Sequence, residues 1–230
     1  MPSGRLHIAI IPDGNRRWAK AHALHPWEGH RKATKNLQEI LEYCRTDPAI
    51  GVLTVWGFST ENWKRDPETV KRLMEMLEEY LRDQRAYLHK EHIRLFHSGR
   101  RDHFSPTLRS LMEELLEETK TYSDFSLHLA VDYGGKDEII RAWEKAQSSK
   151  LKAQSPQSSD PIRPLLDNPD LPDIDCIIRT AGEMRTSNFF LWQSTYAEWI
   201  FVKKYFPDFT VSDFKEALKE FRERTRRFGK

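Results

Sequence analysis

The sequence has little of what marks secreted, membrane-spanning or disulfide-stabilised proteins. Its 230 residues include only two cysteines, Cys44 and Cys176, which lie far apart and form no metal-binding spacing. A reduced cytoplasmic interior is therefore the simplest expectation for its location. No apolar run reaches the length of a membrane span. The N-terminus lacks the hydrophobic stretch of a secretory signal.

An excess of one charge is also missing, because 37 Lys and Arg residues balance 35 Asp and Glu residues to a net charge of +2. This balance speaks against nucleic acid as a partner, so any anion site must come from local clustering. Phosphate loops of the G-x-x-x-x-G-K and G-x-G-x-x-G types are absent, which disfavours nucleotides. Hydrophobic residues make up 38% of the chain, which is enough to build a core.

Strand-like and helix-like stretches alternate along the chain, which predicts one α/β domain over residues 1–230 with a mainly parallel sheet. The expected strands are Leu6–Ile11, Val52–Phe58, Ile93–His97, Phe125–Val131, Ile174–Ile178 and the end of Asn188–Phe201. Helices are expected near Arg16, over His30–Cys44, Asp66–Lys90, Ser105–Leu116, Lys136–Ala146 and Val211–Arg227. Ser148–Pro172 is rich in Ser, Pro, Gln and Asp, and we expect a mobile surface segment there.

The first expected strand ends in Asp13-Gly14-Asn15-Arg16-Arg17-Trp18, preceded by Pro12. In open α/β folds, ligands bind beyond the carboxyl ends of strands. A helix that begins after Gly14 would aim free N–H groups at a phosphate, and guanidinium groups grip phosphate well. Asp13 fits beside phosphates if Mg²⁺ lies between them. The plainer alternatives are that Asp13 caps a helix and that the arginines form a surface patch.

Further polar clusters follow other expected strands or open a helix. Gly29-His30 permits close approach and a donor to phosphate, although His30 alone also fits an ordinary surface position. Phe58–Arg65 crowds hydroxyls, an amide, a tryptophan and cations into one loop, and Arg179–Asn188 places two arginines around a glycine. Glu198 is a candidate second metal ligand or a plain surface glutamate. Together these clusters predict an enzyme or binding protein for diphosphates. The apolar and aromatic strands between the loops offer a place for a hydrocarbon tail.

At these residues the chain resembles the cis-prenyltransferases, a family typified by undecaprenyl diphosphate synthase. The resemblance covers nearly the whole chain. The matching stretches are Asp13–Trp18, Gly29-His30, Phe58–Arg65, Tyr133-Gly134-Gly135, Ile178–Phe189, Trp192–Glu198 and Arg227-Phe228-Gly229.

The resemblance implies a mostly parallel six-stranded sheet ringed by helices, a hydrophobic tunnel and a homodimer. It implies Mg²⁺-dependent condensation of isopentenyl diphosphate with an allylic diphosphate such as farnesyl diphosphate, with a new cis double bond. The Asp66–Lys90 helix shows no added segment, which favours a product of short or medium length. Such a lipid product allows peripheral contact with a membrane.

Roles carried over from the family fall on named positions. The catalytic residues would be Asp13, Asn15 and Ser59, and the metal ligands Asp13 and Glu198. The substrate-binding residues would be Gly14, Arg16, Arg17, Trp18, His30, Ser59, Glu61, Asn62, Trp63, Arg65, Arg179, Arg185, Ser187 and Gly229. Gly229 belongs to a terminal motif that is expected to reach the partner's active site.

The chain departs from the family pattern at several positions. Pro26 stands where many members carry an arginine four residues before the histidine, and Arg16 is our candidate substitute. Pro12 replaces a common methionine, and Asp132 replaces a common asparagine. Two alternatives stay open: a relative that joins prenyl units by branching or cyclisation, and a non-catalytic partner subunit. The second is disfavoured because Asp13 and the arginine loop are both retained.

Overall fold

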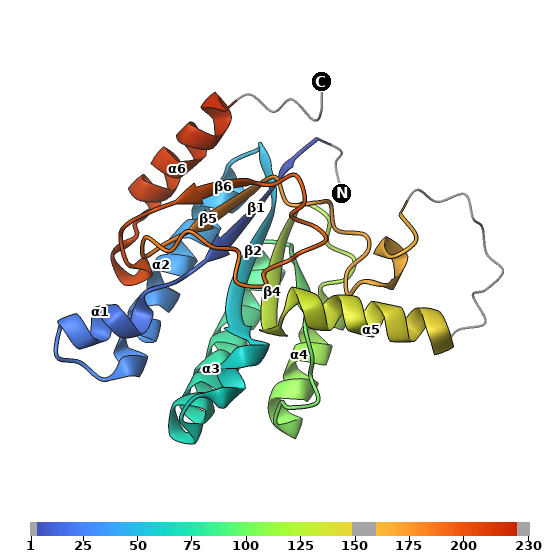
Figure 1. Ribbon diagram of the computed structural model, residues 1–230, viewed down its shortest axis with the longest axis horizontal. Helices are drawn as coiled ribbons and strands as arrows, with labels where there is room; N and C mark the ends of the chain where they lie inside the picture. The colour runs from blue at the N-terminus through green and yellow to red at the C-terminus, as the bar shows by residue number, and fades with distance from the viewer. Residues whose placement is uncertain (1–3, 149–159, 225–230) are drawn as a thin grey trace.

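A single six-stranded sheet forms the centre of the computed structural model, which describes residues 4–148 and 160–224 (Figure 1). The strand order is β3-β4-β2-β1-β5-β6, and every neighbouring pair is parallel. The strands are β1 (Leu6–Ile11), β2 (Ile50–Ser59), β3 (Ile93–Ser98), β4 (Phe125–Tyr133), β5 (Cys176–Arg179) and β6 (Glu198–Phe201). The expected α/β class and its parallel sheet are confirmed.

The helices are α1 (Asn15–Ala21), α2 (Pro26–Thr46), α3 (Pro67–Lys90), α4 (Pro106–Glu118), α5 (Gly135–Ser148) and α6 (Val211–Glu223). Within the described residues, three short 3₁₀ helices join them: η1 (Thr60–Lys64), η3 (Arg163–Leu165) and η4 (Phe206–Asp208). The starts of α3 and α4 follow the expected caps, since Asp66 and Ser105 each accept a backbone N–H from the first turn. α2 begins four residues earlier than expected, because Pro26 suits the first turn of a helix. Among the described helices, none combines the length and apolar character needed to cross a membrane.

The two faces of the sheet differ in character because alternate residues of each strand point to opposite sides. One face is apolar and packs against α2, α3, α4 and α6 through residues such as Ile10, Leu53, Val55, Leu127 and Leu129. In Figure 1, α5 and the described chain from residue 160 onward lie over the other face. That second face carries a smaller apolar cluster around Tyr133, Phe189 and Phe190.

A buried polar network runs across the second face beneath the segment that carries Asn168. His7 Nε2 lies 2.6 Å from Thr54 Oγ1, which lies 2.9 Å from His128 Nδ1, and His128 Nε2 lies 2.8 Å from Ser98 Oγ. Asn168 Nδ2 donates to Ser98 Oγ at 2.9 Å and closes the network. We call these five residues the histidine network. It ties β1, β2, β4 and β3 together, since it takes one side chain from each.

The described part of Ser148–Pro172 packs against this face. Leu166 and Leu171 are buried, and Arg141 donates to Asp167 Oδ2 at 2.7 Å. Residues 160–172 are therefore anchored on the domain. The rest of the segment in which mobility is expected, residues 149–159, lies outside the described residues.

The carboxyl ends of the strands bring the expected polar loops to one edge of the sheet. Ile11 at the end of β1 is paired with Arg179 at the end of β5. On the other side, Ser59 at the end of β2 is paired with Tyr133 at the end of β4. The segments that begin at Asp13, Ser59 and Arg179 therefore lie at the same edge, as predicted for a ligand site in this class of fold.

Candidate active site

An ion pair between Asp13 and Arg179 forms the centre of the site. Arg179 Nη2 lies 3.0 Å from Asp13 Oδ2, while Asp13 Oδ1 accepts from the Gly14 N–H at 2.7 Å and from Arg17 at 3.3 Å. Partial burial raises the pKa of Asp13, but the bonds from Arg179 and Gly14 and the charges of Arg179 and Arg17 outweigh it. The pKa therefore lies below its ordinary value, and Asp13 is ionised at neutral pH.

Two glycines allow the backbone around Asp13 to fold this tightly. Gly14 has a φ of 97°, and a Cβ there would lie 2.5 Å from the Tyr205 ring. Gly29 opens the way for close packing of α1 on α2, because its Cβ would lie 2.0 Å from the Asn15 backbone oxygen. Any side chain at either position would displace the elements that carry the site.

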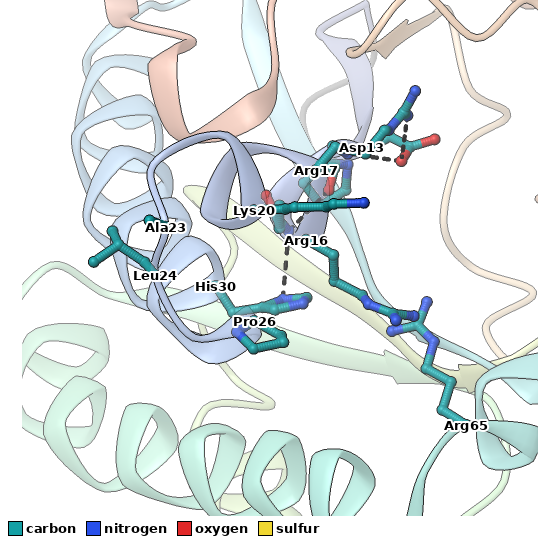
Figure 2. Close-up of a pocket in the computed structure, with 12 residues that line it drawn as sticks. Asp13, Arg16, Arg17, Lys20, Ala23, Leu24, Pro26, His30 and Arg65 are labelled. Atoms are coloured by element: carbon teal, nitrogen blue, oxygen red, sulfur yellow. Dashed lines mark hydrogen bonds and ion pairs between the residues drawn. The ribbon is translucent and has the colours of Figure 1, made fainter.

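A pocket of about 660 Å³ opens beside Asp13, and we call it the Arg16 pocket. Its wall carries cationic side chains from two segments: Arg16, Arg17, Lys20 and Arg65. Figure 2 shows the guanidinium groups of Arg16 and Arg65 facing each other across it. Burial, followed by the charge of Arg16, lowers the pKa of Arg65. Two like charges held in this arrangement predict an anionic ligand between them.

Asn15 and His30 lie at the inner end of the Arg16 pocket. Asn15 Nδ2 donates to the Pro12 carbonyl at 3.1 Å and lies 3.4 Å from His30 Nδ1. Asn15 Oδ1 and His30 Nε2 are buried without a hydrogen-bond partner among the described residues. Burial, with smaller contributions from the charges of Arg65 and Arg16, lowers the pKa of His30 to about 4. His30 is thus neutral at pH 7, and both unpaired atoms are available to a ligand.

A second pocket of about 710 Å³, the Arg179 pocket, lies on the other side of Asp13. Arg179 is almost fully buried and donates to Ser187 Oγ at 2.8 Å and to the Arg185 carbonyl. Its Nε has no partner among the described residues. Ser187 and Asn188 both have positive φ values, 52° and 70°, which mark a strained loop of the kind common at functional sites.

The remaining wall of the Arg179 pocket includes Ser59, Glu61, Asn62 and Arg65 from the β2–α3 connection. Ser59 and Asn62 form a reciprocal capping box that fixes the start of η1. Asn188 donates to Glu61 at 3.1 Å and so joins the two loops. Asn188 also accepts the Lys136 N–H at 2.8 Å.

A third pocket is small and mainly apolar, with a volume of about 130 Å³. This apolar pocket lies between α2, α3 and the apolar face of the sheet, and its wall includes Leu37, Phe58, Leu73, Leu77, Leu129 and Val131. Pro12, Asn15 and His30 line all three pockets. The two cation-lined pockets and the apolar pocket therefore converge on the same residues.

The structure does not turn every expected substrate-binding residue toward these pockets. Trp18 donates from its indole N–H to Asp208 at 2.8 Å, and Trp63 donates to Asp132 at 2.6 Å. Arg185 is more than half exposed and pairs with Glu183. These three side chains are not among the described residues that line the pockets.

Glu198, the second candidate metal ligand, lies far in space from Asp13 of the same subunit. It begins β6 opposite Cys176, at the start of β5, whereas Asp13 follows the opposite end of the sheet. Glu198 Oε2 pairs with Arg224 at 3.0 Å instead. Gly229 and its motif lie outside the described residues.

Lys20 and Lys136 line the pockets but were not among the predicted site residues, and Asn188 was placed in the Arg179–Asn188 cluster without a role of its own. A signal existed for each of them. Lys20 lies one helical turn after Arg16 and Arg17, Lys136 directly follows Gly134-Gly135, and Asn188 sits inside the matched Ile178–Phe189 stretch.

One cluster of potential metal ligands is found among the described residues, and the acid Asp13 lies at the pockets. Asp102, His103 and Asp132 hold potential ligand atoms within 4.8 Å of one another, but both Asp132 oxygens already receive hydrogen bonds or ion pairs from Trp63 and His103. Asp13 offers an ionised carboxylate at the pockets. Because Mg²⁺ in phosphate sites takes few carboxylates and many phosphate or water oxygens, Asp13 fits that ion.

Comparison with known proteins decides the family. A family model described as "Putative undecaprenyl diphosphate synthase" matches residues 11–229. The chain belongs to the undecaprenyl diphosphate synthase family. It is therefore a transferase of prenyl groups and a prenyl diphosphate synthase.

Individual relatives agree. The chain is 42% identical to an isoprenyl transferase of Aquifex aeolicus over 97% of this chain and 95% of that protein. It is also 42% identical to a geranylgeranyl-diphosphate-specific tritrans,polycis-undecaprenyl-diphosphate synthase of Pyrococcus horikoshii, over 97% of this chain and 86% of that protein. Lavandulyl diphosphate synthase of Lavandula x intermedia, solved with dimethylallyl diphosphate, superposes with a TM-score of 0.90 at 32% identity over 99% of both chains.

Proposed function

We propose that this protein uses Mg²⁺ to condense isopentenyl diphosphate with an allylic prenyl diphosphate, forming a cis-polyprenyl diphosphate of short or medium length. The observation that carries the proposal is the convergence of two cation-lined pockets and one apolar pocket on Pro12, Asn15 and His30. Two diphosphate head groups and one hydrocarbon tail need this combination of surfaces. The two head-group sites must also be adjacent for their carbon atoms to react.

The Arg16 pocket would take the allylic diphosphate. Its tail would enter the apolar pocket, which shares Pro12, Asn15 and His30 with the head-group site. Arg16, Arg17 and Arg65 would stabilise the negative charge that grows on the departing diphosphate. Asp13 would hold Mg²⁺, which supplies further charge neutralisation at that diphosphate when bound.

The Arg179 pocket would take isopentenyl diphosphate. Arg179 and Ser187 are hydrogen-bonded to each other there, and the unpaired Arg179 Nε offers a further donor. Asn15 and Ser59 line this pocket and would take part around the site of proton removal. The apolar wall of the third pocket would exclude water from the allylic cation.

The finer assignments in this proposal rest on family resemblance. These include Mg²⁺, a homodimer, a role for Glu198 and Gly229, and peripheral contact with a membrane.

The apolar pocket has a volume of about 130 Å³, close to the roughly 150 Å³ cavity that binds benzene in another protein, so it holds about one isoprene-sized group in this conformation. Longer products would require this pocket to widen during elongation.

A turnover assay tests the proposal directly. The purified chain is incubated with labelled isopentenyl diphosphate, Mg²⁺ and farnesyl or geranylgeranyl diphosphate, and the products are separated by chromatography and mass. We expect a polyprenyl series that disappears when the metal is chelated. No product with any allylic primer would contradict the proposal.

A branched condensation is the second candidate, because a lavandulyl diphosphate synthase superposes closely on this chain. The same assay with dimethylallyl diphosphate alone separates the two activities. A branched ten-carbon diphosphate would identify the second candidate, whereas extension only in the presence of isopentenyl diphosphate supports elongation.

A further inference from the structure

Asp132 is a buried carboxylate next to the site. Its side chain has no exposed surface, and its φ of 51° lies in the left-handed region that few residues other than glycine adopt. A carboxylate costs free energy to bury unless charged or polar partners compensate it. The position of Asp132 therefore calls for an explanation from its contacts.

A bulge in β4 produces this position. Phe58 is paired with Val131 and Ser59 with Tyr133, so Asp132 is the extra residue between two adjacent positions of β2. Bulges re-aim side chains, and they are frequent next to active sites. Here Val131 packs in the apolar cluster on one face, while Tyr133 packs in the cluster on the other.

The Asp132 carboxylate binds side chains from two loops: Trp63 in the connection between β2 and α3, and His103 in the connection between β3 and α4. The Trp63 indole N–H donates to Oδ1 at 2.6 Å, and His103 Nδ1 lies 2.7 Å from Oδ2. The Trp63 ring also packs against Phe58 and His103, with centroids 4.9 Å and 5.0 Å away. We call Asp132, Trp63 and His103 the Asp132 clasp.

The clasp holds the segment that supplies side chains to both diphosphate pockets. Trp63 belongs to η1, which directly follows Ser59. Glu61, Asn62 and Arg65 line the Arg179 pocket, and Arg65 also lines the Arg16 pocket. Arg65 faces Arg16 at the site where like charges repel in the absence of an anion (Figure 2). An anchor at Trp63 keeps Arg65 in place against this repulsion.

We propose that Asp132 is a positioning residue that fixes the Ser59–Arg65 segment through Trp63 and so holds Arg65 beside the bound diphosphate. The inference rests on the proposed function only for the identity of that ligand. Asp132 itself lines none of the three pockets. A carboxylate suits the role because it accepts from two donors at once, whereas an asparagine amide offers one acceptor and one donor.

A double-mutant cycle tests the clasp. Asp132→Ala removes the acceptor, and Trp63→Phe removes the donor but keeps an aromatic ring. We expect each to lower kcat/KM for the allylic diphosphate by about tenfold or more, since small misplacements of binding groups are costly. The double variant should be no worse than the poorer single variant, because both remove one interaction.

Further variants separate positioning from a general loss of structure. Asp132→Asn should fall between the wild type and Asp132→Ala, and Arg65→Ala should cost less in the Asp132→Ala background than in the wild type. Asp102→Asn is the matched control, since Asp102 is an exposed acid next to His103, and its only ion-pair contact with another described residue is a 3.9 Å approach to Arg100. It should leave kcat/KM unchanged.

Binding of inorganic pyrophosphate, measured by calorimetry, makes the outcome independent of turnover. The clasp predicts at least about tenfold weaker binding in Trp63→Phe and Asp132→Ala, even if the wild type proves inactive. If the wild type binds pyrophosphate but shows no turnover, the proposed function is contradicted and the clasp is still testable by binding. Multiplicative losses in the double variant, or unchanged binding in folded single variants, would overturn the clasp. If Asp132→Ala does not fold, Trp63→Phe and Asp132→Asn decide the matter.

Discussion

The diphosphate pockets and the histidine network are both polar, yet they differ in whether their buried polar groups have hydrogen-bond partners. In the network, His7, Thr54, His128 and Ser98 satisfy one another in a continuous chain. At the pockets, Asn15 Oδ1, His30 Nε2 and Arg179 Nε are buried without partners among the described residues. Unpaired buried groups are costly, and proteins tolerate them where a ligand will complete them.

The two regions also differ in charge. The network holds neutral histidines, because burial lowers the pKa of His7 to about 4 and takes that of His128 well below its ordinary value. The pockets hold facing guanidinium groups whose mutual repulsion remains until an anion arrives. The comparison indicates that the network stabilises the sheet, while the pockets give up stability in favour of binding.

The largest effect should come from Asp13. Asp13→Asn removes the ionised carboxylate that pairs with Arg179 and would hold Mg²⁺. We expect kcat to fall by about 10³-fold, comparable to the loss of a key electrostatic group in other enzymes. Initial rates at saturating substrates measure it. A rate within tenfold of the wild type would count against the assigned role.

Breaking the network should affect stability instead. His128→Leu leaves Thr54 and Ser98 without their shared partner in a buried place. We expect the free energy of unfolding to fall by about 2–4 kcal/mol, since two buried hydroxyls each lose a hydrogen bond. Urea titration measures this loss. The kcat of the folded fraction should stay within about twofold of the wild type. A large fall in kcat would contradict the claim that the histidine network affects stability alone.

Acid should lower the stability of the fold through its buried histidines. Burial lowers the pKa values of His7 and His97 to about 4, so the unfolded chain binds more protons than the folded chain between about pH 4 and 6.5. Stability is then fully present above pH 6.5 and falls as the pH drops toward 4. The slope should approach about 1.4 kcal/mol per pH unit for each such histidine. Unfolding free energies measured from pH 7.5 to 4.5 test this, and a flat profile would contradict it.

Ligand binding should distinguish the pockets from the histidine network through the pKa values of their histidines. His30 lies at the pockets, where the charges of Arg65 and Arg16 add to burial in lowering its pKa to about 4. A bound diphosphate offsets those charges, so pyrophosphate should raise the His30 pKa and leave those of His7 and His128 unchanged. Histidine proton shifts in an NMR titration report each site. Equal shifts at all three residues would remove the distinction.

The smallest effect should come from Arg16. Arg16→Ala removes one cation from the Arg16 pocket, in which Pro26 also lies at the position of the missing family arginine. We expect KM for the allylic substrate to rise about tenfold, in line with one charge-assisted hydrogen bond. Stability should hold or rise, because the repulsion with Arg65 ends. An unchanged KM would reject Arg16 as the substitute.

The sequence contained enough to predict the sheet and the loops that meet at its edge. Apolar runs marked the strands, and Asp66 and Ser105 marked helix starts, because these signals are local. The histidine network could not be foreseen, since His7, Thr54 and His128 are brought together only by strand order. Trp63 matched a family motif, yet its direction depends on the bulge at Asp132. Glu198 lies at the opposite end of the sheet from Asp13 for a similar reason, because strand register decides which end it occupies.

The most direct test of the account is a crystal structure with an allylic thiodiphosphate analogue, isopentenyl diphosphate and Mg²⁺. The account predicts the allylic diphosphate between Arg16 and Arg65 with the metal at Asp13, its tail among Leu73, Leu77 and Leu129, and isopentenyl diphosphate at Arg179. A tail lying outside the apolar pocket, or a diphosphate bound away from Asp13, would contradict it.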